Sequence, residues 1–283
     1  VKKGMAEYFE QEVFRNPEIY NGTDKSSREI ELTIQQKMAY DDLLLKYRSS
    51  KAQVSLLYGV TGSGKTSVFM KLIDSVIKDN KGVIVMVPEI ALTSQLINLF
   101  IGRYGQNVAV FHSGLSVGER LDQWKRVRNG SAKIAVGTRS AVFAPFDDIG
   151  LIIMDEEQEY TYKSEAAPRF HARDVAKYRC SKHSCLLLLA SATPSVESFY
   201  NAQKGIYSIN RLTARFGNAK LPKVVIADMN EDIQQNNKSG IGSVLMQAVE
   251  KNLEKGRQSI ILLNRRGYNT FVSCKKCGEV VTS

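Results

Sequence analysis

The sequence predicts an α/β fold, in which helices flank a parallel β-sheet. Short apolar runs rich in Val, Ile and Leu alternate with helical patterns along most of the chain. These runs lack the apolar–polar alternation of a half-exposed strand, which is typical of strands buried on both faces. The motif GVTGSGKT, at residues 59–66, follows one such run and opens a helical pattern. A phosphate-binding loop requires this strand–loop–helix context.

Length and composition favour a globular protein of about two domains. The chain has 283 residues, of which 43% are hydrophobic and 24% charged, and these values exclude a wholly disordered chain. Its apolar runs fall far short of the ~20 residues that a membrane-spanning helix needs. The first residues show no signal-peptide pattern, so we expect a cytoplasmic protein. Because the sequence starts at Val1 and stops soon after Cys277, we expect it to be a fragment.

The elements follow one another in a consistent order. Residues 1–30 are mixed and polar and include a turn-rich segment, so we expect the tail of a preceding module and a linker. A helical pattern over residues 31–47 opens the predicted first domain, residues 31–212. We expect strands of this domain at residues 54–58, 83–87, 108–111, 134–136, 151–154 and 186–190.

A second α/β domain is predicted to begin within residues 213–283. The segment 211–222 contains Gly217 and Pro222 and is a candidate linker. After it we expect a strand at 224–227, a helix at 244–255 and a strand at 259–263.

The glycine-rich motif predicts a nucleoside triphosphate site. Its glycines let backbone N–H groups curl around phosphate oxygens at a helix N-terminus, which favours an anion. Lys65 should neutralise the β- and γ-phosphates, and the Thr66 hydroxyl should ligate Mg²⁺. The predicted nucleotide-binding residues of this loop are Gly59, Thr61, Gly62, Ser63, Gly64, Lys65 and Thr66.

An acidic pair follows the apolar run at residues 151–154. Asp155 should hold Mg²⁺, and Glu156 should orient and deprotonate the attacking water. We therefore predict Lys65, Asp155 and Glu156 as the catalytic residues.

The charge balance favours a polyanionic partner such as nucleic acid. Lys and Arg number 39 against 29 Asp and Glu, which gives a net charge of +10. Polar segments at residues 87–95, 136–143 and 191–193 each follow a predicted strand, where open α/β sheets place ligand-contacting loops. Their Thr, Ser, Arg and N–H groups suit a phosphodiester backbone.

The order of these motifs carries a family resemblance. The chain reads GVTGSGKT, VPEIALTSQ, FHSGLSVGER, VGTRSAVFAPF, DEEQ, YKSEAAPRFHARDVA and SATPSVES. Over residues 30–278 it resembles superfamily 2 helicases, and among them the bacterial primosomal helicase family. The resemblance implies RecA-like domains and an ATP-dependent 3′→5′ DNA helicase that reloads replication at stalled forks. It also implies single-stranded and forked DNA, primosome proteins and single-strand-binding proteins as partners.

The resemblance also implies roles for individual residues. Gln36 matches the family's adenine-contacting segment, and Thr193 lies in the SAT motif that couples hydrolysis to domain motion. Arg139 and Ser140 lie in the GTRSA block that faces DNA. Residues 160–173 match an aromatic-rich loop, in which aromatics interleaved with cations can stack bases and bind phosphates. The predicted nucleic-acid residues of this loop are Tyr160, Tyr162, Lys163, Arg169, Phe170 and Arg173.

Two features depart from the family's pattern. The family usually has His where this chain has Gln158, which hydrogen-bonds but cannot become cationic. We expect hydrolysis to survive, and the sequence leaves open how Gln158 affects its coupling to DNA. The later family motifs are missing, including an arginine that is worth ~10³–10⁵ in rate in comparable enzymes. We therefore expect this chain to bind ATP and to hydrolyse it poorly.

The cysteines fall into two pairs. Cys274 and Cys277 have the spacing of half a zinc ribbon and resemble the start of the family's zinc-binding insertion. We therefore expect Zn²⁺ in the intact protein. Cys180 and Cys185 are expected to be buried thiols.

Two other classes of function stay open. A non-enzymatic DNA-binding or scaffold module would explain the basic charge, but it would not need the Asp155–Glu156 pair. A non-motor P-loop enzyme, such as a nucleotide kinase, would transfer phosphoryl groups to a small molecule and would be indifferent to DNA.

Overall fold

A computed structural model describes residues 29–89, 91–92, 94–215, 222–228, 241–262, 272–273 and 280–281. The chain forms two compact units, Val1–Ala219 and Lys220–Ser283. Almost all of the expected N-terminal tail, residues 1–30, lies outside the described residues. The interpretation of the two units as a first motor domain and the start of a second stays a prediction.

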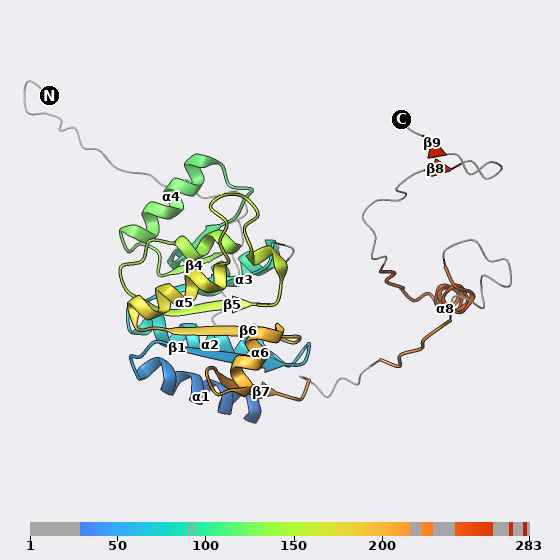
Figure 1. The fold of residues 1–283 in the computed structure, drawn as a ribbon, viewed down its shortest axis with the longest axis horizontal. Coiled ribbons are helices and arrows are strands. Elements are labelled where there is room, and N and C mark those ends of the chain that lie inside the picture. Colours follow the sequence, from blue (N-terminus) through green and yellow to red (C-terminus); the bar gives the residue numbers. More distant parts are fainter. Residues whose placement is uncertain are drawn as a thin grey trace, which may run out of the picture. The chain divides into compact units, whose positions relative to one another are not determined.

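The first unit alternates helices and strands along the chain (Figure 1). Its elements are α1 (Ile34–Arg48), β1 (Gln53–Gly59), α2 (Lys65–Lys78), β2 (Gly82–Met86), α3 (Ser94–Tyr104), β3 (Val108–Phe111), α4 (Val117–Arg128), β4 (Ile134–Gly137), β5 (Ile149–Asp155), α5 (Ala172–His183), β6 (Leu186–Ser191), α6 (Val196–Gln203) and β7 (Ser208–Leu212). Short 3₁₀ turns, η3 (Arg139–Phe143) and η4 (Tyr160–Tyr162), follow β4 and β5.

The strands form one parallel sheet in the order β3-β4-β2-β5-β6-β1-β7. Side chains of α1, α2 and α3 enter the core on one face, and side chains of α4, α5 and α6 enter the core on the other. Alternate residues of β2 serve the two cores: Val83 and Val85 face the first, and Ile84 and Met86 face the second. The predicted α/β class is confirmed, and this double burial explains the unbroken apolar runs.

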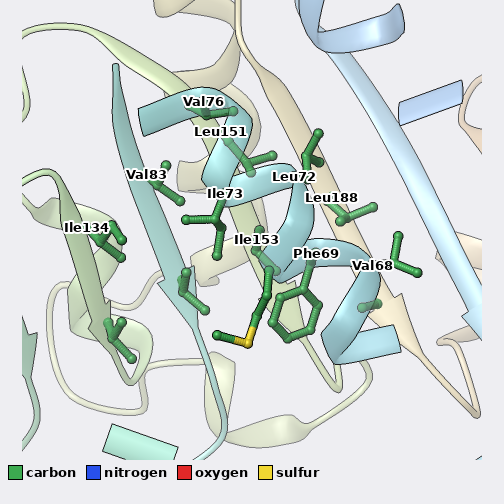
Figure 2. Close-up of a cluster of buried hydrophobic side chains, with 14 of the residues drawn as sticks. Val68, Phe69, Leu72, Ile73, Val76, Val83, Ile134, Leu151, Ile153 and Leu188 are labelled. Atoms are coloured by element: carbon green, nitrogen blue, oxygen red, sulfur yellow. The ribbon is translucent and has the colours of Figure 1, made fainter. Parts of the chain in front are cut away.

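Helix α2 packs along the middle of the sheet (Figure 2). Val68, Phe69, Leu72, Ile73 and Val76 are essentially inaccessible to solvent. Burying a side chain of this size contributes roughly 1.5–3 kcal/mol. This packing fixes the start of α2, and therefore the loop that precedes it. The strand residues that Figure 2 labels in the same cluster are Val83, Ile134, Leu151, Ile153 and Leu188.

The first-unit predictions are confirmed for the six expected strands, with small shifts in their ends. The strand β7 was missed, and the candidate linker was wrongly begun at Arg211, which lies inside it. The reason is physical: β7 is an edge strand whose Ser208, Asn210 and Arg211 are polar, so it lacks the apolar run of a buried strand.

The second unit contains α8 (Ser243–Glu254), which confirms the predicted helix, and an antiparallel pair of β8 (Val272–Ser273) and β9 (Val280–Val281). The prediction of a strand at residues 224–227 is wrong, because these residues are not in a strand. Residues 259–262, where the other strand was predicted, are not in a strand either. Val224, Val225 and Ile226 are exposed, and among the described residues they have no ladder partner. An apolar run becomes a strand only where a neighbour satisfies its backbone. Across the described ranges, no helix combines the length and apolar character needed to cross a membrane.

Candidate functional site

Because the strands are parallel, the motif loops that follow them all lie at the same end of the sheet, where the strands have their carboxyl ends. In the strand register, Tyr58 of β1 pairs with Ser191 of β6, and Asp155 of β5 pairs with Ala190 of β6. Three segments therefore leave the sheet from adjacent strands. They are the glycine-rich loop (residues 59–66), the acidic segment (residues 155–158) and the SAT segment (residues 191–193).

The glycine-rich loop has the backbone of an anion-binding nest. Gly62 and Gly64 adopt left-handed φ angles of 76° and 79°, which glycine accepts without the cost that a Cβ would bring. Helix α2 begins at Lys65, so its first N–H groups have no partner within the helix and face the loop. The buried Lys65 Nζ donates to the carbonyl of Gly59 at 2.9 Å. A phosphate chain fits this combination of N–H groups, helix terminus and ammonium.

The oxygen donors beside this loop suit a hard divalent cation. Thr66 offers a hydroxyl in the first turn of α2, and Asp155 offers a carboxylate at the end of β5. Burial, followed by the neighbouring charge of Glu156, raises the pKa of Asp155 to about 6, while the charge of Lys65 acts in the opposite direction. Carboxylate and hydroxyl oxygens are ligands that Mg²⁺ accepts together with phosphate oxygens. The residues therefore fit a magnesium–nucleotide complex.

Glu156 has a strained backbone. Its φ is 44°, in the left-handed region that residues with a Cβ rarely adopt, at a cost of roughly 1–2 kcal/mol. Its N–H donates to Asp155 Oδ1 at 3.1 Å, and its carbonyl accepts from the Glu159 N–H at 3.0 Å. Such strain persists only where the surroundings hold it, and it often marks functional sites.

Gln158 bridges the acidic segment to the SAT segment. Its Nε2 donates to Glu156 Oε2 at 3.0 Å, and its Oε1 accepts from the Ser191 hydroxyl at 2.6 Å. The Ser191 hydroxyl in turn accepts from the Thr193 N–H at 2.8 Å. The two predicted coupling residues, Gln158 and Thr193, are thus linked to Glu156 through one chain of hydrogen bonds.

Gln36 lies against the glycine-rich loop. Its Oε1 accepts from the Thr33 N–H and completes a capping box at the start of α1. Its Nε2 donates to the Ser63 carbonyl at 2.8 Å, and the side chain is buried. The predicted adenine contact stays a prediction, and it requires Gln36 to exchange these bonds.

Part of the aromatic-rich loop is accessible. Tyr160 is 68% exposed, and Lys163 and Arg169 are exposed as well. Phe170 is partly buried and packs edge-to-face on Phe143, with ring centroids 5.0 Å apart. The loop that follows the acidic segment therefore presents accessible aromatic and cationic groups. The Ser140 side chain, in the GTRSA block, is exposed as well.

The fold and these motifs agree with comparisons to known proteins. The family model for DEAD/DEAH box helicases matches residues 33–201. The chain belongs to this family. The helicase domain therefore includes the whole site from the capping box at Thr33 to the SAT segment, and the match ends within α6.

The relatives of this helicase chain confirm the predicted resemblance. It is 42% identical over 280 residues to the replication restart protein PriA of Bacillus subtilis (strain 168), covering 99% of the chain and 35% of that protein. It is 40% identical over 288 residues to PriA of Synechocystis sp. (strain ATCC 27184 / PCC 6803 / Kazusa), covering 99% of the chain and 34% of that protein. The chain thus spans about one third of these relatives. The solved structure of RecG bound to a three-way DNA junction has a TM-score of 0.57 at 19% identity, over 81% of this chain and 29% of that chain, and supports the fold.

Two of the predicted nucleic-acid residues of the helicase domain bond to other parts of the protein. Tyr162 is fully buried, and its hydroxyl lies 3.1 Å from the Met86 carbonyl and 2.5 Å from the Asp155 carbonyl. Its ring fills the core, so it cannot stack on a base. Arg173 is partly buried and forms an ion pair with the buried Glu157. Sequence spacing could not separate these two from their exposed neighbours in the loop.

Arg139 has a bonding role in the helicase domain that its motif did not reveal. Its Nη1 donates to the carbonyls of Thr161 and Lys163, at 3.1 and 3.0 Å. The guanidinium therefore holds the backbone of the aromatic-rich loop against η3. Its predicted contact with DNA stays a prediction.

Sequence reasoning missed the environment of Glu157. This carboxylate accepts from the Ser195 N–H at 2.7 Å and from the Ser198 hydroxyl at 2.9 Å, in addition to Arg173. A signal was present, because Ser195 precedes a helical pattern as an N-cap residue does. The sequence could not predict that Glu157 accepts a hydrogen bond from this N-cap residue.

The two cysteine pairs have different outcomes. Cys180 and Cys185 are free and buried, as expected. Cys274 and Cys277 lie outside the described residues. Within the described ranges, no group of three or more His, Cys, Asp and Glu side chains could hold a metal ion.

Proposed function

We propose that this chain is the nucleotide-binding part of an ATP-dependent 3′→5′ DNA helicase of replication restart. In this proposal, ATP hydrolysis is coupled to movement along single-stranded DNA. One observation carries it: Gln158 joins Glu156 to Ser191, so the acidic segment and the SAT segment form one bonded unit beside the glycine-rich loop. A domain that only held a nucleotide would need the loop but not this link.

The chain's own residues divide the work of hydrolysis. The N–H groups after Gly62 and Gly64 and the Lys65 ammonium bind the β- and γ-phosphates. Thr66 and Asp155 would hold Mg²⁺, which neutralises the charge that develops on the phosphate oxygens. Glu156 accepts a proton from the attacking water and holds that water in line with the γ-phosphate.

Single-stranded DNA is the proposed track, with Tyr160, Lys163, Arg169, Phe170 and Ser140 beside it. Exposed aromatics can stack on bases without reading sequence, and the cations can bind phosphates. The net charge of +10 favours the same partner. Forked DNA, primosome proteins, single-strand-binding proteins and a cytoplasmic location follow from the likeness to PriA and are part of the proposal.

Zinc is proposed for the whole protein through Cys274 and Cys277, with two further ligands outside this chain. The arginine that completes hydrolysis in the family is also proposed to come from outside it. This chain alone should therefore bind ATP and turn it over slowly.

The deciding experiment measures ATP hydrolysis with and without single-stranded DNA, on the whole protein and on the 283-residue chain. We expect DNA to stimulate the whole protein at least tenfold and the chain alone to be slow, because the second-domain arginine is worth ~10³–10⁵ in rate. Lys65→Ala should abolish ATP binding, and Glu156→Gln should keep binding but lose turnover. Arg128→Gln, at an exposed surface ion pair with Asp147, is the control.

Three outcomes would contradict the proposal. Turnover by Lys65→Ala at the wild-type rate would refute the assignment of the nucleotide site. Hydrolysis by the whole protein that DNA does not change, together with phosphoryl transfer to a small molecule, would favour a non-motor P-loop enzyme. Binding of DNA without any hydrolysis would favour a binding or scaffold module.

A further inference from the structure

A buried ion pair joins Glu157 to Arg173. The Glu157 side chain is 0% exposed and the Arg173 side chain 14% exposed, and Arg173 Nη1 lies 2.9 Å from Glu157 Oε2. The same Nη1 donates to the hydroxyls of Ser195 and Ser198, at 2.8 and 3.0 Å. Burying a carboxylate costs free energy unless it has an ion-pair partner and hydrogen bonds. Glu157 has both.

The pair joins three segments that are distant in the chain. Glu157 directly follows Glu156 at the end of β5. Arg173 lies in the first turn of α5, where the aromatic-rich loop ends. Ser195 is the N-cap of α6 and follows the SAT segment by two residues. One carboxylate therefore anchors the starts of both helices to the acidic segment.

The position of Glu157 restrains the backbone of Glu156. The N–H of Glu157 donates to the Ala190 carbonyl at 3.2 Å, while its carboxylate accepts the Ser195 N–H at 2.7 Å. Residue 157 is thus fixed at both its backbone and its side chain. Glu156, with its φ of 44°, cannot relax to a right-handed conformation without displacing Glu157 from these bonds.

We infer that the Glu157–Arg173 pair positions Glu156 for hydrolysis and ties the end of the aromatic-rich loop to it. The inference rests on the proposed function, in which Glu156 activates the attacking water. Arg173 is then a positioning residue that acts through Glu157. It contacts neither nucleotide nor nucleic acid.

The test compares Arg173→Gln, Arg173→Lys and Glu157→Gln in the whole protein. Three quantities are measured: kcat and KM for ATP at saturating single-stranded DNA, the dissociation constant of ADP, and the dissociation constant of an oligothymidine. Misplacing a catalytic group by about 1 Å can cost ~10²-fold in rate. We therefore expect Arg173→Gln and Glu157→Gln to lower kcat by about 10–100-fold, with both dissociation constants unchanged within threefold.

Arg173→Lys is the conservative variant. It keeps the positive charge but not the geometry of the guanidinium, so kcat should recover part of the loss seen in Arg173→Gln. Arg169→Gln, at an exposed position of the same loop, is the matched comparison and should weaken oligothymidine binding. Thermal melting establishes that each variant is folded. If Arg173→Gln does not fold, Glu157→Gln decides, and wild-type kcat in that variant overturns the inference.

Two patterns separate the inference from the proposed function. A tenfold loss of oligothymidine affinity in Arg173→Gln with kcat unchanged at saturating DNA would make Arg173 a nucleic-acid contact and overturn the inference alone. Absence of DNA-stimulated hydrolysis in the wild-type whole protein would instead count against the proposed function.

Discussion

The side chain of Gln158 donates a hydrogen bond to the carboxylate of Glu156, with 3.0 Å between Nε2 and Oε2. At its other end, the amide accepts from the hydroxyl of Ser191, which accepts from the N–H of Thr193. The Ser191 hydrogen is therefore committed to Gln158, and the orientation of the amide is set by its partners. A neutral amide keeps these bonds at any pH at which the protein is folded.

Replacing Gln158 with His should introduce a pH dependence. A neutral imidazole can donate to Glu156 from one nitrogen and accept from Ser191 at the other, as the amide does. Below about pH 6.5 the imidazole becomes cationic and both nitrogens donate, so the bond from Ser191 is lost. We expect kcat of Gln158→His to match the wild type at pH 8 and to fall more steeply as the pH decreases towards 5.5.

The measurement is the pH profile of DNA-stimulated ATP hydrolysis for the two proteins. Gln158→Ala is the control, because it removes both bonds without adding a titrating group. Losing hydrogen bonds to a charged group costs about 1.5–3 kcal/mol, so its rate should fall about tenfold or more at every pH. Parallel profiles for wild type and Gln158→His would contradict the bonding described here.

Tyr162→Phe should destabilise the first unit. The Tyr162 hydroxyl lies between the carbonyls of Met86 and Asp155, and burial, reinforced by the Asp155 charge, raises the pKa of Tyr162 far above its usual value. Removing the hydroxyl leaves buried carbonyl groups without this donor, at a cost of about 1–3 kcal/mol. The free energy of unfolding in urea measures it.

Tyr160→Phe is the matched control, because Tyr160 is two residues away and exposed. A surface change of this kind usually lies within about 0.5 kcal/mol of the wild type. Equal stabilities of the two variants would show that the buried hydroxyl contributes nothing.

The sequence sufficed for features whose signal is local. The glycine-rich loop is a contiguous motif, and buried strands such as β2 and β6 show unbroken apolar runs. Features that depend on distant partners were not predictable. Tyr162 and Arg173 have the residue types of a nucleic-acid loop, yet their partners Met86 and Glu157 come from other segments. Only the folded chain separates such residues from their exposed neighbours.

Gly64→Ala should perturb the glycine-rich loop in two ways. A Cβ at this position would lie 2.3 Å from Gln36 Nε2, and the backbone has a φ of 79°. The left-handed backbone costs roughly 1–2 kcal/mol once a Cβ is present, and the contact displaces the Gln36 amide from Ser63. We expect lower stability and weaker nucleotide binding.

Gly205→Ala isolates the first of these effects. Its φ is 73°, but a Cβ there would meet nothing within 4 Å. It should lose roughly 1–2 kcal/mol of stability from backbone strain and bind nucleotide as the wild type does. The difference between the two variants, measured by urea unfolding and by nucleotide titration, reports the contact with Gln36. Identical losses in both variants would mean that Gln36 moves aside at no cost.

His171 should make stability fall as the pH decreases. Its Nδ1 accepts from the Arg173 N–H and caps α5. Burial, followed by the charge of Arg173, lowers the pKa of His171, and the charge of Lys177 acts in the same direction. The charges of Asp174 and Glu157 act in the opposite direction. Because the folded-state pKa lies below the unfolded value of about 6.5, the unfolded state binds the proton more readily in this window. The contribution of neutral His171 to the free energy of unfolding is therefore fully present above about pH 6.5 and is lost as the pH falls through the folded-state pKa.

His171→Asn separates the cap from the titration. Asn is a strong N-cap residue and does not titrate, so its stability should equal that of the wild type at pH 8 and exceed it at pH 5. His171→Ala removes the cap as well and should lose about 1 kcal/mol at pH 8. Urea unfolding at pH 8, 7, 6 and 5 measures all three proteins, and the other two histidines contribute equally to each. A constant difference between wild type and His171→Asn across this range would show that His171 does not resist protonation in the folded state.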